Sequence, residues 1–264
     1  MTLNEAVKIL EAAGIDSPLY DAREIFNLFC PKPIMLNSQS DDPGLLEMIR
    51  RRADREPLQY IIGNVGFYRE SYIVTPACLI PRSDTEILVD YAVKNLPEGA
   101  RFMDLCTGSG CVAISVLCNT KNTNAIAFDI DPDTIQVAKQ NAELNRVADR
   151  IEIRQMDLMN DHPDEQVFAV VSNPPYVTDE AYERLEKEIY HEPKKAFVGG
   201  LDGGDFYRHL TPIYKDKITD DGFIAYEIGY DQADLLREIA ASNHMSCEII
   251  KDLGGNDRVA VLRK

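Results

Sequence analysis

A glycine-rich turn, DLCTGSG (104–110), follows a short apolar run and precedes a predicted helix. Glycine lets the backbone approach a ligand closely, and the amide groups at a helix N-terminus face the same crevice. Asp129 comes about 20 residues after Gly110, at the end of the next predicted strand, where a carboxylate accepts hydrogen bonds from a ribose diol. The pair predicts an adenosine-containing cofactor. Which one stays open, because Ala113 replaces the third glycine of the GxGxxG pattern, and Gly108 with Gly110 alone is compatible with a simple tight turn.

Three more aspartates follow the predicted strands 124–130 and 151–156. Asp157 comes directly after the strand 151–156, where an adenine-contacting carboxylate is expected in a nucleotide crevice. A plain turn residue or helix cap at Asp157 is equally compatible with the local sequence. Asp131 and Asp133 flank Pro132, and we predict that both cap the helix that begins there.

The stretch VSNPPYV (171–177) ends another apolar run, so Asn173 is predicted at the carboxyl end of a strand, over the crevice of Asp129. The Asn173 side-chain oxygen and the Pro174 carbonyl are two acceptors that would orient the N–H groups of a planar amide or aromatic amine. Pro175 restricts Pro174 to extended conformations and so determines where that carbonyl points. Tyr176 offers an aromatic face for a planar group.

Such an arrangement suits methylation of a weakly nucleophilic nitrogen. With a sulfonium methyl donor the leaving group is a neutral thioether, so positioning and electrostatics would supply most of the catalysis without a strong base. A turn without chemistry is the alternative for Asn173-Pro174-Pro175 when these residues are considered alone. The neighbouring crevice favours the methylation site.

Alternating strand and helix patterns from residue 100 onward must position these residues. Strands are predicted at 101–106, 124–130, 151–156, 167–172, 222–228, 247–251 and 258–262, and helices at 110–118, 132–145, 180–188, 205–217 and 232–242. This alternation is typical of an α/β fold with a mostly parallel sheet and helices on both faces.

The first 57 residues lack strand-like alternation and predict a small helical domain. Its helices are expected from Leu3 to near Gly14, from Leu19 to Phe29 with Pro31 and Pro33 as stops, and from Pro43. The basic residues 50–52 and Arg55 are interpreted as a solvated helix face, with a partner-binding patch as the alternative. Residues 58–80 are expected to form a β-hairpin or extended linker, followed by a helix capped by Ser83 or Asp84.

The composition excludes several classes of protein. The net charge is −16, from 44 acidic and 28 basic residues, which disfavours tight binding to nucleic acid and suits a basic partner protein. The six cysteines form no CxxC pair and no ligand-like cluster with histidine, so we expect reduced thiols and no metal. No apolar run approaches roughly 18 residues, and the start lacks a secretion signal, which predicts a cytoplasmic protein.

The motifs DLCTGSG, FDIDPD and SNPPYV, in that order, resemble class I S-adenosylmethionine-dependent methyltransferases that act on planar exocyclic nitrogens. The segments EPLQYIIGNVGFY, LIPRSDTEILVD, EPKKAFVGGLDGGDFYRHL, YEIGYDQ and DLGGNDRVAVL narrow the resemblance to the HemK/PrmC family of release-factor glutamine methyltransferases. It covers nearly the whole chain, from about Leu3 to Lys264. NPPY alone is shared with DNA and RNA adenine methyltransferases, whereas the joint occurrence of these segments is much more specific.

The resemblance implies a Rossmann-like, seven-stranded, mostly parallel sheet with an antiparallel last strand. A helical substrate-recognition domain (1–57) and a β-hairpin linker (58–80) would precede the methyltransferase domain (81–264). The implied reaction methylates the glutamine side chain of the GGQ motif in peptide chain release factors, with S-adenosyl-L-methionine as donor and S-adenosyl-L-homocysteine as product. The protein would act as a monomer, without membrane contact.

Carried over position by position, Cys106, Thr107, Gly108, Ser109 and Gly110 would line the methionine part of the cofactor. Asp129 would bind the ribose, and Asp157 with Leu158 would flank the adenine. The glutamine amide would be held by Asn173, Pro174, Pro175 and Tyr176. Of these, Asn173, Pro174 and Tyr176 would be the catalytic residues, and Asn173 would also contact the cofactor.

Some positions depart from the family pattern. Cys106 occupies the first position of a loop that usually carries three glycines, so it must keep φ below zero or accept strain. The segment PRSDTE (81–86) replaces a PRPETE-like sequence, and GGLDGGDFY (199–207) is shorter than usual. An adenine methyltransferase acting on DNA or RNA, and a cofactor-binding scaffold without activity, are the alternatives.

Overall fold

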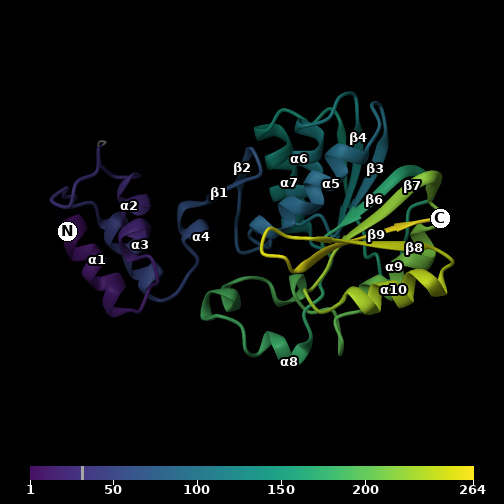
Figure 1. The fold of residues 1–264 in the computed structure, drawn as a ribbon. Helices are drawn as coiled ribbons and strands as arrows, with labels where there is room; N and C mark the ends of the chain where they lie inside the picture. Colours follow the sequence, from purple (N-terminus) through teal and green to yellow (C-terminus); the bar gives the residue numbers. More distant parts are fainter. Residues whose placement is uncertain (31–32) are drawn as a thin grey trace. The chain divides into compact units, whose positions relative to one another are not determined.

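The computed structural model describes residues 1–30 and 33–264 (Figure 1). Pro31, expected to help end the second helix, lies outside the described residues. The chain divides into two compact units, one of Met1–Asn64 with Glu186–His191 and the other of Val65–Leu185 with Glu192–Lys264. Each unit is described by itself below.

The smaller unit is helical. Its helices are α1 (Leu3–Ala12), α2 (Pro18–Phe26), α3 (Pro43–Ala53) and α4 (Leu58–Ile62), together with the 3₁₀ turn η2 (Lys187–His191). Thr2 and Glu5 form a capping box at the start of α1, in which each side chain satisfies an amide of the other residue. The apolar faces of the helices form a core of their own, centred on Leu10, Ile25 and Ile49.

Two expectations for this part of the chain are wrong. Arg52 is not on a solvated face, because it is buried and donates to Asp21 at 2.7 Å and to Glu188 at 3.3 Å. Residues 58–62 form α4 and not a strand, because Pro57 begins a helical turn there and Gly63 ends it with φ +84°. A two-stranded sheet of β1 (Asn64–Phe67) and β2 (Glu70–Ile73) follows.

The larger unit is built on a seven-stranded sheet with the order β5-β4-β3-β6-β7-β9-β8. Its strands are β3 (Arg101–Leu105), β4 (Asn124–Asp129), β5 (Ile151–Gln155), β6 (Val167–Ser172), β7 (Ile218–Glu227), β8 (Ser246–Lys251) and β9 (Asp257–Arg263). Strands β3 to β7 pair in parallel, whereas β9 is antiparallel to both β7 and β8. The predicted fold class, with its antiparallel last strand, is confirmed.

Helices cover both faces of this sheet (Figure 1). They are α5 (Glu86–Asn95), α6 (Cys111–Cys118), α7 (Pro132–Leu144), α9 (Asp205–Tyr214) and α10 (Ala233–Ser242), with the short α8 (Asp179–Tyr182) and the 3₁₀ turns η1 (Ser83–Thr85) and η3 (Lys194–Ala196) in the connections. Neighbouring strand residues such as Phe102 and Met103 point to opposite faces, so the sheet is apolar on both sides and supports two core clusters.

Several helix ends differ from the prediction. Neither Ser83 nor Asp84 caps a helix, because both lie within η1 and no side chain caps α5. Asp131 does cap α7, accepting from the amides of Asp133 and Thr134, whereas Asp133 lies in the first turn. The helix expected at 180–188 is reduced to α8 and η2.

No helix within residues 1–30 and 33–264 combines the length and the apolar character that crossing a membrane requires.

Candidate functional site

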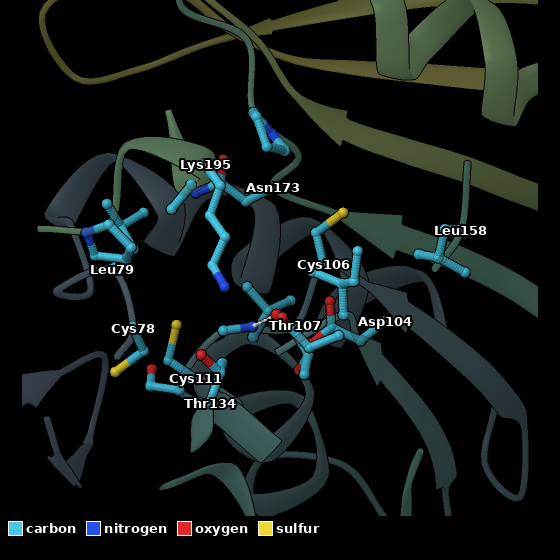
Figure 2. A pocket seen from close by; sticks show the side chains of 18 of the residues that line it. Cys78, Leu79, Asp104, Cys106, Thr107, Cys111, Thr134, Leu158, Asn173 and Lys195 are labelled. Carbon is cyan, nitrogen blue, oxygen red and sulfur yellow. Dashed lines mark hydrogen bonds between the residues drawn. The ribbon is translucent and has the colours of Figure 1, made fainter. Parts of the chain in front are cut away.

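A cavity of about 240 Å³ lies in the larger unit, where β3, β4 and β6 end (Figure 2). Its lining includes Cys106, Thr107, Gly108, Ser109, Asp129, Asp157, Leu158, Asn173 and Pro175 from the predicted site. Because parallel strands bring their carboxyl ends to one edge of the sheet, residues distant in the sequence meet there. Gly110, Pro174 and Tyr176 are not part of this lining.

The buried side chain of Asp104 stabilises the glycine-rich turn through two hydrogen bonds. This buried carboxylate accepts from the Thr107 hydroxyl at 2.6 Å and from the Ala113 amide at 3.2 Å. Burial raises the pKa of Asp104 to about 7, against the lowering effect of those two hydrogen bonds. Asp104 thus shapes the floor of the cavity, although it was not among the predicted site residues.

Cys106 adopts the left-handed conformation, with φ +58°. The sequence had left open whether a cysteine at this glycine position would do so. A non-glycine residue in this region carries a steric cost, so the turn keeps its shape here under strain. Gly110 has φ +82°, and a Cβ there would lie 2.8 Å from the Ile114 side chain, which requires glycine at the start of α6.

Asp129 ends β4 with both carboxylate oxygens turned to backbone amides. Oδ2 accepts from Gly108 at 2.9 Å and Oδ1 from Asp131 at 3.1 Å. Burial raises the pKa of Asp129, while these hydrogen bonds and the charge of Lys195 act in the opposite direction. The carboxylate therefore ties the glycine-rich turn to β4 and still contributes to the cavity wall.

Asp157 is a turn residue that also lines the cavity. Its carboxylate accepts from the Met159 amide at 3.1 Å and from the Asn160 side chain at 2.7 Å, as a turn residue does, and it also lines the cavity. The apolar side chains beside it belong to Ile130, Met156, Leu158 and Met159. A flat aromatic ring system fits such a wall.

Asn173 follows β6 and lines the same cavity (Figure 2). Its Nδ2 donates to the Thr85 hydroxyl at 3.1 Å. With the nitrogen engaged, the opposite atom of the carboxamide, Oδ1, is the acceptor that remains for a ligand. The carbonyl of Pro174 has no hydrogen bond within residues 1–30 and 33–264, so it is a second available acceptor.

Tyr176 is anchored by groups from three segments. Its hydroxyl donates to Oε1 of Glu227 at 3.2 Å, and its carbonyl accepts from Gln232 Nε2 at 3.0 Å. Gly203 packs so closely against this segment that a Cβ there would lie 2.0 Å from the backbone carbonyl oxygen of Tyr176. The backbone and the ring of Tyr176 are thus held in place by residues that lie at least 27 positions later in the chain.

Other lining residues were missed by the sequence reasoning. They include Ala77, Leu79, Pro81, Arg82 and Thr85 before β3, and Pro193, Lys195 and Ala196 after α8. The buried Glu192 joins these two segments, accepting from the Ile80 amide at 2.9 Å and from the Arg82 guanidinium. Lys195 reaches into the cavity (Figure 2). Its ammonium group pairs with the Asp131 carboxylate. A signal was available, because both segments belong to motifs quoted for the family resemblance.

The donor set of the cavity fits S-adenosylmethionine. Two carboxylates lie near an apolar wall, which suits a ribose diol beside an adenine ring, and the tight turn of Cys106–Gly110 allows close backbone approach. The acidic surroundings also suit a sulfonium cation.

Comparisons with known proteins agree with this chemistry. The family model "Methyltransferase small domain" matches residues 83–200. The chain is 34% identical to the release factor glutamine methyltransferase of Fusobacterium nucleatum subsp. nucleatum, covering 99% of this chain and 77% of the relative. It is also 34% identical to that of Koribacter versatilis, over 100% and 99% of the two chains. Among solved structures, ribosomal protein L11 methylase from Lactobacillus delbrueckii subsp. bulgaricus matches with a TM-score of 0.54 at 18% identity, over 72% of this chain and 83% of that one, which shows a shared fold.

Proposed function

The chain belongs to the release factor glutamine methyltransferase family, and on this basis we propose how its site works. It transfers a methyl group from S-adenosylmethionine to the side-chain amide nitrogen of the glutamine in the GGQ motif of peptide chain release factors. The observation that carries the proposal is the Asn173 carboxamide, which lines the cavity beside Asp129 with its Nδ2 already engaged by Thr85.

The cofactor would be held by the turn Cys106–Gly110, by Asp129 at the ribose, and by Asp157 and Leu158 at the adenine. When bound, S-adenosylmethionine supplies an activated methyl group whose departure leaves a neutral thioether. Asp129 accepts from hydroxyl groups without rearranging, because the Gly108 and Asp131 amides already hold its carboxylate.

The remaining work is the orientation of a poor nucleophile. An amide nitrogen delocalises its lone pair, so its N–H groups must be held by acceptors while the nitrogen faces the methyl group. Oδ1 of Asn173 and the carbonyl of Pro174 are those acceptors, and Pro175 and Tyr176 complete the substrate site. Both acceptors belong to a rigid segment, which reduces the entropy lost when the substrate is positioned.

The proposal extends to the partner. The net charge of −16 favours a basic protein substrate over a phosphate backbone. The helical domain at the N-terminus would bind the body of the release factor, and the protein would act as a monomer. Adenine methylation in DNA or RNA uses a similar NPPY segment and is the alternative to exclude.

A labelling experiment tests this function. The purified protein is incubated with methyl-labelled S-adenosylmethionine and a release factor, its Gln→Ala variant in the GGQ motif, or nucleic acid. We expect label only in the intact release factor. Label in nucleic acid, or equal label in the Gln→Ala factor, contradicts the proposal.

A further inference from the structure

The wall of the cavity includes a cationic side chain that has no role in the mechanism described so far. Among the lining residues in the described part of the chain, the two basic ones are Arg82 and Lys195. Three carboxylates also line the cavity, those of Asp104, Asp129 and Asp157. Lys195 pairs with Asp131 and its charge acts on Asp129, which places it at the end proposed for the ribose. Arg82 lacks a comparable assignment.

Arg82 is held in place by a buried carboxylate. The side chain of Glu192 is 1% exposed; its Oε1 accepts from Nη2 of Arg82, and its Oε2 accepts from the Ile80 amide at 2.9 Å. The Arg82 side chain is 36% exposed, and its guanidinium has no other polar partner within residues 1–30 and 33–264. Because a guanidinium carries five N–H donors, most of them stay available to a ligand in the cavity.

The segment that carries Arg82 crosses the cavity and is fixed at both of its ends. At one end, beside the start of α7, the Ala77 carbonyl accepts from the Thr134 hydroxyl at 2.6 Å. At the other end, Thr85 accepts from Nδ2 of Asn173 at 3.1 Å, and its amide donates to the Arg82 carbonyl at 3.1 Å. Arg82 therefore lies on the Asn173 side of the cavity, where the methionine part of the cofactor would present its methyl group.

A carboxylate in the methionine part of the cofactor needs a partner that the glycine-rich turn does not readily supply. Three amides of the turn, those of Thr107, Gly108 and Gly110, already donate to carbonyl or carboxylate oxygens of the protein. The carboxylates that line the cavity repel a further carboxylate unless a cation neutralises it. A fixed guanidinium meets both needs, because its planar fork of donors matches the two oxygens of a carboxylate.

We propose that Arg82 binds the carboxylate of the methionine part of S-adenosylmethionine, and that Glu192 is the positioning residue that holds the guanidinium for this contact. The inference rests on the cofactor named in the proposed function. It adds a charge contact at the methionine end to the ribose contact of Asp129. Such a contact distinguishes S-adenosylmethionine from adenosine derivatives that lack the amino-acid carboxylate. A carbonyl group of the substrate peptide is the competing ligand for the same donors.

Calorimetric titration without a release factor tests the inference on two ligands. One is S-adenosylmethionine, and the other is its decarboxylated form, which keeps the adenosine, the sulfonium and the amine. We expect Arg82→Met to raise the Kd of S-adenosylmethionine about 10- to 100-fold, the range for the loss of a charge-assisted hydrogen bond. The Kd of the decarboxylated form should rise less than about threefold, because that ligand has no carboxylate to lose a partner.

Further variants separate the contact from the fold. Arg82→Lys keeps a charge beside Glu192 but loses the fork, so it should raise the Kd of S-adenosylmethionine selectively by about 3- to 10-fold, and it decides the question if Arg82→Met does not fold. Glu192→Gln weakens the support of the guanidinium and should give a selective loss of the same kind. Arg237→Met is the control, because Arg237 also pairs with a carboxylate, Asp234, but is exposed on α10 and does not line the cavity. It should leave both Kd values unchanged.

An unchanged Kd of S-adenosylmethionine in the Arg82 variants, or an equal loss for both ligands, overturns the inference. A higher KM for the release factor with an unchanged cofactor Kd also overturns it, by assigning Arg82 to the substrate. Because binding is measured without a substrate, the two proposals fail separately. A wild-type protein that binds S-adenosylmethionine but does not methylate the release factor overturns the proposed function alone, whereas one that does not bind S-adenosylmethionine overturns both.

Discussion

Asn173 and Thr85, 88 residues apart in the chain, are joined by a 3.1 Å hydrogen bond from the carboxamide nitrogen to the hydroxyl oxygen. The bond links the end of β6 to the turn that precedes α5, and both residues line the cavity. A reactive group that is held on one side presents a defined face on the other, which is the basis of catalysis by positioning. The predictions below concern this relationship and the groups that frame it.

Removal of the Asn173 carboxamide should affect turnover far more than cofactor binding. Asn173→Ala deletes the acceptor that we propose for methyl transfer, so we expect kcat to fall at least about 100-fold while the cofactor Kd stays within about threefold. Labelled methyl transfer and calorimetry measure the two quantities. A parallel loss of cofactor affinity would assign Asn173 to cofactor binding or to folding.

Asp129 should show the reverse pattern. Asp129→Asn keeps the shape but weakens the charge-assisted hydrogen bonds, so we expect the cofactor Kd to rise about 10- to 100-fold with kcat nearly unchanged at saturation. Asp133→Asn is the matched control, since it removes the same charge from an exposed position in the first turn of α7. Unchanged affinity in Asp129→Asn would refute the ribose assignment.

The stability of the fold should depend on the protonation of Glu227. Burial raises its pKa from 4.5 to about 7, so the folded state favours the neutral carboxyl. The resulting stability is fully present below pH 4.5 and is lost as the pH rises toward 7. Glu227→Gln should therefore match the wild type near pH 4.5 and exceed its free energy of unfolding by about 1–3 kcal/mol at pH 8.

Urea unfolding between pH 4.5 and pH 8 measures this difference. Glu248→Gln, at an exposed position of β8, is the control and should leave the pH dependence of unfolding as it is in the wild type. A difference between Glu227→Gln and wild type that stays constant with pH would show that Glu227 is ionised throughout this range.

Because Cys106 has a left-handed conformation, a glycine variant at this position should be more stable than an alanine variant, the reverse of the usual order of stability. At φ +58° a Cβ costs about 1–2 kcal/mol, so Cys106→Gly should be more stable than Cys106→Ala by about 1 kcal/mol. At Cys247, within β8, the same two substitutions should give the opposite order, because strand backbone suits alanine better. Urea unfolding compares the four variants, and equal orders at both cysteines would show that the Cys106 backbone is not strained.

The strand–helix alternation of the larger unit could be predicted from the sequence because hydrophobic periodicity is a local property. Strand β6 was expected at its observed bounds, and Asp131 was identified as a cap from its place before Pro132. Helix α4 was not predicted, because a segment of five residues is too short for periodicity to distinguish helix from strand. Pro57 and Gly63 decided its conformation.

The sequence alone predicted which residues would line one site: the glycine-rich turn, Asp129 and Asn173 each stand at or just after the end of a predicted strand, and parallel strands end at one edge of the sheet. Only the tertiary structure decided how these groups are held. Thr85 and Glu227 reach Asn173 and Tyr176 through contacts that span 88 and 51 residues, and Lys195 reaches Asp131 across 64. No local pattern encodes such contacts, because the direction of a side chain and the partner it meets depend on how distant elements pack.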